Sequence, residues 1–596
     1  MGNDLRALFL CGLCWFATPA WALENSLSQH PSPYLAQHGR DPVAWQEWNA
    51  DTVARARREN KLLFVSVGYY ACHWCHVMQR ESYRNQKIAA SLNRDFIPVK
   101  VDRELNTGLD AALQVFSSRL LKTAGWPLNA FVTPDGYPVY VVLYAQPDDF
   151  SGTLRNLSAR WRSDAAGVRQ LARHAAQNQQ DKLVQKTVNA ETVAHWEAAF
   201  GKLARAEQDD FRGGFGQVSK FPMAPQLALM LELQAGSADT ARADFLRLTL
   251  DQMAARGLRD QVHGGFFRYT TDPGWETPHF EKMLYDNAQL ALVYLRAAEV
   301  LQESRYRQTG LSTVDFMLRT LAAHGGGFYT STSAVDVQGR EGTYYLWSRQ
   351  ALKLRLSPAE YAAARRVWRL DAPPPFDEGY LPAEWLAPTL EERPRLQSAY
   401  ASLRRARMRL NLLRDVKVNA GLNGLALSAL SAAVRADPAY KAAATRHYRF
   451  LRERMMPGGQ LVKAVSGGTN MVGAELEDYA FVAQGMLDYA RSMGDEEARR
   501  LSLALARKAW ATFATPAGWK SEKQPLLATM LPEAVMADDA VASPSAVLVR
   551  VSLDLGDAEL GARSRSALQW QSTAMVRDAF SFPTQINVMR RALDKR

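Results

Sequence analysis

Two cysteines three residues apart, Cys72 and Cys75, are the side chains with the clearest chemical potential in this sequence. They enclose His73 and Trp74 in the tetrapeptide Cys-His-Trp-Cys. If a helix begins at Cys72, its unpaired N–H groups and its dipole stabilise the Cys72 thiolate. Cys75 then lies one turn inside the helix, where its thiol can resolve a mixed disulfide. The pair is therefore a candidate for thiol–disulfide exchange.

Strands and helices alternate around this pair. Residues 61–67 form a β-rich run directly before it, and residues 96–102 form a second predicted strand. Apolar residues at helical spacing predict a helix over 109–122, and a Pro-Asp-Gly turn at 134–136 predicts a hairpin of 130–133 with 139–144. This order predicts a small α/β domain of about 110 residues.

A proline stands directly before the third predicted strand, in Gly125-Trp126-Pro127-Leu128. A proline at that point can adopt a cis bond and present the preceding backbone to a peptide. A strand, a Cys-x-x-Cys helix start and a downstream proline form the thioredoxin arrangement. The predicted catalytic residues are Cys72, Cys75 and Pro127, and the predicted tuning residues are His73, Trp74 and His76.

Three other interpretations of the cysteine pair stay open. In an oxidising compartment the pair can be a static structural disulfide. Cys72-x-x-Cys75-His76 also matches the c-type haem attachment motif, with Met78 as an axial ligand, although a strand-then-helix context is not typical of a cytochrome. The same cysteines with His73 and His76 would crowd a metal ion with four ligands from five residues. We therefore predict no metal and no cofactor.

The second half of the chain reads as long amphipathic helices with few strands. A Gly-Gly-aromatic turn recurs at 213–215, 264–266 and 326–328, with looser copies at 458–459 and 518–519. The spacing of about 50 to 66 residues fits helix pairs repeated around an axis. We predict a closed α/α toroid rather than an open solenoid, because the units are long and irregular.

Length and composition support two domains. The chain has 596 residues, 47% of them hydrophobic, and this length is greater than a single domain with one hydrophobic core ordinarily has. Four cysteines in this length exclude a disulfide-stapled scaffold. The net charge of +11 is spread thinly, so we predict no nucleic-acid partner. The expected domains are residues 23–185, a thioredoxin-like domain with an N-terminal extension, and residues 190–596, the toroid.

The first 22 residues have the pattern of a secretory signal peptide. Arg6 supplies the positive charge, residues 7–16 are apolar, and Ala20-Trp21-Ala22 is a cleavage site of the small-x-small type. We predict cleavage after Ala22, a periplasmic or secreted mature protein, and no stable membrane anchor. Cleavage would also remove Cys11 and Cys14.

The motifs, taken in order, resemble the spermatogenesis-associated protein 20 family. The resemblance covers nearly the whole mature chain, from Ser32-Pro33-Tyr34-Leu35 to Ser543-Pro544-Ser545. It implies an N-terminal thioredoxin fold and a C-terminal six-hairpin α/α toroid similar to glycosidases and sugar epimerases. The motifs include Cys72-His73-Trp74-Cys75-His76, Val101-Asp102-Arg103-Glu104, Gly125-Trp126-Pro127-Leu128-Asn129, His263-Gly264-Gly265-Phe266 and the run from Pro278 to Ala288.

This chain departs from the family pattern at several positions. Many thioredoxins bury an acid six residues before the first cysteine, where this chain has Ser66. In the toroid, Ala334 and Val416 replace acids and Leu422 replaces a tryptophan. These losses weaken the case for chemistry in the toroid.

Three hypotheses of function follow, the third being a non-catalytic assembly protein that presents both domains to a partner. The first is an exported thiol–disulfide oxidoreductase whose partner is a protein thiol or disulfide. The alternative is a toroid that binds or modifies a saccharide, with the cysteines as a staple, since sugar hydrolysis needs two carboxylates beside the bond. On helical spacing, His279 and Glu281 fall on different faces of one helix. The candidate toroid ligand residues are Asp272, Trp275, His279, Glu281, Asp286, Asp336, Glu341 and Asp478.

Overall fold

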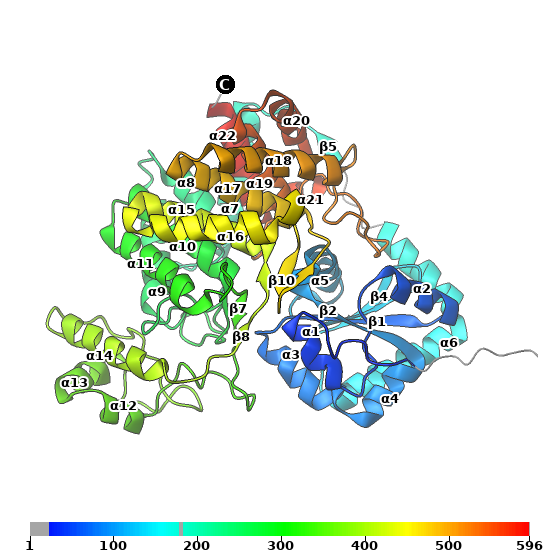
Figure 1. Cartoon of the computed structure of the whole chain (residues 1–596), viewed down its shortest axis with the longest axis horizontal. Coiled ribbons are helices and arrows are strands. Elements are labelled where there is room, and N and C mark those ends of the chain that lie inside the picture. The colour runs from blue at the N-terminus through cyan, green and yellow to red at the C-terminus, as the bar shows by residue number, and fades with distance from the viewer. Residues whose placement is uncertain (1–22, 178–182, 595–596) are drawn as a thin grey trace, which may run out of the picture.

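The computed structural model describes residues 23–177 and 183–594. The predicted signal peptide, residues 1–22, lies outside the described residues. An α/β part and a larger helical part lie side by side (Figure 1). In the described segments, no helix is both long enough and apolar enough to cross a bilayer.

A four-stranded sheet forms the centre of the α/β part. Its strands are β1 (Leu62–Gly68), β2 (Phe96–Asp102), β3 (Leu128–Val132) and β4 (Pro138–Val142). They lie in the order β2-β1-β3-β4, with β2 parallel to β1 and the other two pairs antiparallel. β1 and β2 are buried along their whole length, which explains their continuous rather than alternating apolar pattern.

Helices surround this sheet (Figure 1). The one that matters for the site is α3, which begins shortly after β1 ends, with Cys72 as its N-cap residue. This is a thioredoxin-like fold, as the sequence predicts. The helices are α2 (Ala50–Glu59), α3 (His73–Met78), α4 (Gln86–Asp95), α5 (Thr107–Leu121) and α6 (Pro147–Gln177).

The helical part is a closed ring of hairpins. In the described part of the chain, six inner helices each pack against the next, and the last, α22, packs against the first, α8. That last contact excludes an open solenoid and confirms the predicted α/α toroid. The inner helices are α8 (Ala224–Gln234), α10 (Leu284–Val300), α15 (Ala420–Ala436), α17 (Leu476–Met493), α19 (Pro544–Leu555) and α22 (Pro583–Asp594).

An outer helix covers each inner helix. These outer helices are α7 (Ala190–Glu207), α9 (Thr240–Ala255), α11 (Ser304–Phe316), α16 (Lys441–Phe450), α18 (Glu496–Phe513) and α20 (Ala558–Leu568). A three-helix insertion with its own small core leaves the ring between α11 and α15 (Figure 1). It comprises α12 (Arg349–Arg355), α13 (Pro358–Val367) and α14 (Glu392–Arg407).

The recurring Gly-Gly-aromatic turns have a structural basis. Gly265 has φ +74°, and a Cβ there would lie 2.4 Å from the Phe316 ring. The next residue, Phe266, bonds through both its N–H and its C=O to the side chain of Asn287 on α10. The same pair of bonds joins Phe328 to Asn423 on α15. The repeat therefore ties an inner helix to the turn that precedes it.

Candidate functional site

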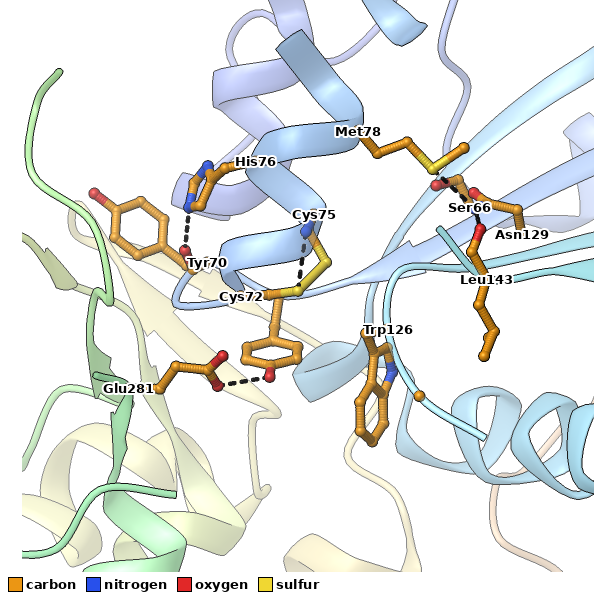
Figure 2. Close-up of a disulfide and its surroundings, with 12 residues drawn as sticks. Ser66, Tyr70, Cys72, Cys75, His76, Met78, Trp126, Asn129, Leu143 and Glu281 are labelled. Carbon is orange, nitrogen blue, oxygen red and sulfur yellow. Dashed lines mark hydrogen bonds between the residues drawn. A yellow bond between two sulfur atoms is a disulfide. The ribbon is translucent and has the colours of Figure 1, made fainter. Parts of the chain in front are cut away.

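Cys72 and Cys75 form a disulfide at the N-terminus of α3 (Figure 2). The backbone N–H of Cys75 donates to Cys72 Sγ at 3.1 Å, so a helix-terminal donor points at the first sulfur. Such donors stabilise a thiolate at that position after reduction. Cys72 is 3% exposed and Cys75 is 1% exposed, so the disulfide is covered.

The predicted proline lies on a loop close to the pair. The Trp126–Pro127 peptide bond is cis, and Pro127 is buried. The Trp126 ring meets the Tyr69 ring edge-on at 5.7 Å, and its Nε1 donates to Asp110 Oδ1 at 2.8 Å. Figure 2 shows Trp126 on the same side of α3 as Cys72. Strand, helix start and cis-proline thus come together as in a thioredoxin-like domain.

The two flanking residues of the haem motif do not converge. His76 Nε2 lies 2.8 Å from the Tyr70 carbonyl oxygen, whereas the Met78 sulfur accepts from Asn129 Nδ2 at 3.2 Å on the other side of the helix (Figure 2). Burial lowers the pKa of His76 to about 4. Among the described residues, no three His, Cys, Asp or Glu side chains are arranged to hold a metal ion.

The toroid contacts the residues on either side of Cys72. Tyr69, three residues before Cys72, donates its hydroxyl hydrogen to Glu281 Oε2 at 2.6 Å (Figure 2). Arg268 donates to the same tyrosine hydroxyl. His73 Nδ1 lies 3.3 Å from Glu341 Oε2. The face of the thioredoxin-like domain that carries the cysteines is therefore the face that docks.

A segment of the thioredoxin-like domain also contacts the ends of two inner helices. Lys417 Nζ, which precedes α15, lies 3.2 Å from Asp102 Oδ2 and 2.5 Å from Glu104 Oε2. At the start of α5, Thr107 donates its hydroxyl hydrogen to Glu475, the N-cap residue of α17. The N-terminal ends of inner helices α15 and α17 are thus covered by residues 102–108.

Four of the eight predicted toroid residues face the thioredoxin-like domain. His279 and Glu281 belong to the extended segment before α10, so the helix predicted to carry both residues is wrong there; the helix begins at Leu284. In an extended segment, side chains two residues apart point to the same side, whereas helical spacing predicted different faces for His279 and Glu281. His279 Nδ1 lies 2.7 Å from Glu341 Oε1. Asp286 lies in the first turn of α10.

Burial perturbs the acids of this group. Burial raises the pKa of Asp286 to about 8, against the opposing charges of Arg268 and Arg103. Burial also raises the pKa of Glu281, and the Arg268 charge opposes that shift. The pKa values of these two carboxyls therefore depend on the charges of the neighbouring arginines.

The other four predicted toroid residues have structural contacts. Asp272 accepts backbone N–H groups of its own loop, and Asp336 does the same in a turn closed by an Arg340 ion pair. Trp275 is fully buried, with its ring 2.4 Å from the position of a Cβ on Gly214. Asp478 is buried beside Lys463 at 3.0 Å. The structure does not bring these four side chains together with the first group.

Several residues at the docked face had no assigned role in the sequence. Tyr69, Arg268 and Lys417 form the contacts between the domains described above, and Asp102 and Glu104 lie in a motif quoted only for its resemblance. The charged run Asp102-Arg103-Glu104 at the end of an apolar strand is the available signal in the sequence, since buried charges at a strand end need partners.

The fold and the site define a thioredoxin-like domain, with a Cys-x-x-Cys disulfide, docked on an α/α toroid. A family model named Thioredox_DsbH, described as "Protein of unknown function, DUF255", matches residues 24–180. Spermatogenesis-associated protein 20 of Homo sapiens is 30% identical over 543 residues, which covers 78% of this chain and 67% of the human protein. The Mus musculus protein of the same name is 33% identical over 343 residues, covering 54% of this chain and 43% of that protein.

The chain belongs to the spermatogenesis-associated protein 20 family. This confirms the resemblance seen in its motifs. Among solved structures, cellobiose 2-epimerase from Spirochaeta thermophila DSM 6192 is similar with a TM-score of 0.43 and 12% identity, over 68% of this chain and 97% of that one.

Proposed function

We propose that the protein is a thiol–disulfide oxidoreductase that works through Cys72 and Cys75. The observation that carries this is the disulfide at the start of α3, with the Cys75 N–H aimed at Cys72 Sγ. Pro127 directly precedes β3, in the loop whose Trp126 ring contacts Tyr69, and this placement supports a peptide-binding edge beside the pair. The proposed partner is a protein that carries a dithiol or a disulfide.

The exchange conserves atoms and electrons as follows. The Cys72 thiolate attacks a partner disulfide, forms a mixed disulfide and releases one partner thiolate. Cys75 then loses its proton and attacks Cys72 Sγ, which releases the second partner thiolate and closes the Cys72–Cys75 disulfide. Two electrons pass from the cysteine pair to the partner, and the reverse sequence oxidises a partner dithiol. The domains must separate locally in this mechanism, because Cys72 and Cys75 are almost fully buried and the flanking Tyr69 and His73 contact the toroid.

We further propose that this chemistry takes place outside the cytoplasm. The charged, apolar and small-x-small pattern of residues 1–22 supports export with cleavage after Ala22. N-terminal sequencing of the protein purified from its native cell tests this. A mature N-terminus at Leu23 is the expected result, and an intact Met1 would contradict it.

The reduction potential of the cysteine pair tests the oxidoreductase. Thiol trapping of the mature protein across glutathione and dithiothreitol buffers should give a value between about −120 and −270 mV, the range of exchange catalysts. A value below about −300 mV would indicate a structural bridge instead.

Trapping a partner provides the second test. Cys75→Ser leaves the attacking thiol without its resolving partner, so it should accumulate mixed disulfides that a reductant releases. Cys72→Ser with Cys75→Ser is the matched control and should capture none. Equal capture by the two variants would rule out attack by Cys72.

The saccharide alternative has weaker support. Residues 102–108 cover the N-terminal ends of two inner helices, and four of the eight candidate side chains make local structural contacts. Glycan-array binding by the full chain, lost in Glu281→Gln, would favour that alternative.

A further inference from the structure

The first residue of α3, His73, contacts the toroid. Its Nδ1 lies 3.3 Å from Glu341 Oε2, and both side chains are largely buried, with 19% and 23% of their surface exposed. His73 follows Cys72 directly in the chain. A charge on its imidazole therefore acts on the sulfur of the redox pair at short range.

Glu341 also binds a second imidazole. Its Oε1 lies 2.7 Å from His279 Nδ1 and accepts the backbone N–H of Phe280 at 3.4 Å. The rings of His73 and His279 stack with their centroids 5.8 Å apart. One carboxylate thus lies between two histidines that come from different domains.

The charges of this trio favour an ionised Glu341. Burial opposes the charge on Glu341, but the hydrogen bond and the charge of His279 lower its pKa. The same contact raises the pKa of His279 against the effect of burial. The pKa of His73 is lowered overall, mainly by burial and also by the charges of His279 and Arg80, while the Glu341 charge raises it. Glu341 is therefore the neighbour that favours a protonated His73.

We infer that Glu341 of the toroid is a positioning residue of the redox site, which holds His73 beside Cys72 and favours its imidazolium form, so that the thiolate formed on reduction is stabilised. This rests on the proposed exchange at Cys72 and Cys75. When a dithiol reduces the disulfide, it gives up two electrons and two protons. Cys75 takes one proton, the neutral imidazole of His73 takes the other and becomes the imidazolium that Glu341 stabilises, and Cys72 is left as the thiolate. The toroid thereby completes the redox site.

Two substitutions with opposite expected effects test the role of Glu341. Glu341→Gln removes the negative charge, so His73 loses its proton more readily and the pKa of the Cys72 thiol rises. His279→Gln keeps a donor toward Glu341 but removes a competing positive charge, so the pKa of the Cys72 thiol falls. Glu341→Asp keeps the charge and should restore most of the wild-type value. Glu232→Gln, at an ion pair with Arg296 on the toroid, is the matched control and should change nothing.

The measurements are the pH profile of iodoacetamide alkylation of the reduced protein and the reduction potential. For Glu341→Gln we expect alkylation at pH 7 to slow about tenfold. We also expect the equilibrium with glutathione to move about tenfold toward the disulfide, which corresponds to about 30 mV. Should this variant fail to fold by circular dichroism, the opposite shift of His279→Gln still decides the question.

Three outcomes overturn the inference. If Glu341→Gln has the wild-type alkylation midpoint, Glu341 does not act on the thiolate, although the exchange proposal survives. If Glu341→Gln and His279→Gln both speed alkylation by the same factor at every pH, the two substitutions act by opening the contact between the domains and not through the charge of His73. If the wild-type protein exchanges no disulfide at all, both proposals fail.

Discussion

At the residue scale, Ser66 and the buried Lys100 stand where many thioredoxins bury an acid. Ser66 occupies that position, and its hydroxyl oxygen accepts from Lys100 Nζ at 2.9 Å and lies 3.0 Å from the Tyr83 hydroxyl. The ammonium group lies over the rings of Tyr34, Trp45 and Tyr83, at 4.7 to 5.3 Å from their centroids. Burial lowers the pKa of Lys100 to about 7, and the Asp41 charge only partly opposes this.

This shift predicts how stability depends on pH. Between pH 7 and about 10.5, the unfolded chain keeps the lysine proton that the folded chain has lost, so stability should rise with pH. Lys100→Met removes the cost of burying the charge. The variant should therefore be more stable than the wild type by a few kcal/mol near pH 7, since each pKa unit is worth about 1.4 kcal/mol. The gain should shrink toward pH 10.

Urea unfolding of both proteins at pH 7, 8, 9 and 10 measures this. Lys87→Met, exposed on α4, is the control and should give a difference that does not change with pH. A constant difference for Lys100→Met across the same range would show that the Lys100 ammonium is not destabilised in the fold.

At the scale of elements, two asparagines secure the repeat. Asn423 accepts from the Phe328 N–H at 2.8 Å and donates to the carbonyl oxygens of Phe328 and Asn419 at 3.1 and 2.8 Å. Asn287 makes the equivalent bonds with Phe266 and Met283. Each amide therefore joins the first turn of an inner helix to the turn before it, in the buried interior.

Asn423→Ala should destabilise the toroid. It leaves one N–H and two carbonyl groups without this partner inside the protein, and each buried unsatisfied group costs about 1–3 kcal/mol. We expect the free energy of unfolding, measured in urea by circular dichroism, to fall by at least about 2 kcal/mol. Asn470→Ala, exposed on β11 (Thr469–Met471), should change it by less than about 0.5 kcal/mol. Equal effects of the two changes would exclude this role for Asn423.

Sequence reasoning reached these elements because their signals are local. Periodicity predicted β2 at its exact bounds and α5 within two residues, and the Gly-Gly spacing predicted the ring. It misjudged residues 279–283, where hydrogen bonding of Lys282–Met283 to Ser331–Thr332 makes an extended segment that the apolar pattern does not reveal. The contact of Asp102 with Lys417 joins residues over 300 positions apart, so no local pattern could predict that the thioredoxin-like domain covers the end of α15.

At the scale of the whole molecule, Lys417 joins the two domains at a buried point. Its ammonium contacts Asp102 and Glu104 of the thioredoxin-like domain and Asp415 of its own. The lysine and the two aspartates have no exposed side-chain surface. A buried cation shared by three carboxylates makes the docked arrangement depend on a single side chain, because any one carboxylate left alone would be a costly buried charge.

Lys417→Met should therefore loosen the docking and expose the disulfide. Removing one partner of a buried ion pair costs about 3–5 kcal/mol, and separating the domains lets water reach the three carboxylates. We expect dithiothreitol to reduce the Cys72–Cys75 disulfide at least tenfold faster in this variant, measured by trapping free thiols with maleimide over time. The difference in reduction rate between the variant and the wild type should narrow at acid pH, because protonated carboxyl groups need no cation. At acid pH the phosphine reductant TCEP is used in place of dithiothreitol.

Lys202→Met, exposed on α7, is the control and should keep the wild-type rate. If Lys417→Met stays folded and its disulfide is reduced at the wild-type rate, then the toroid does not limit access to the cysteines through this contact.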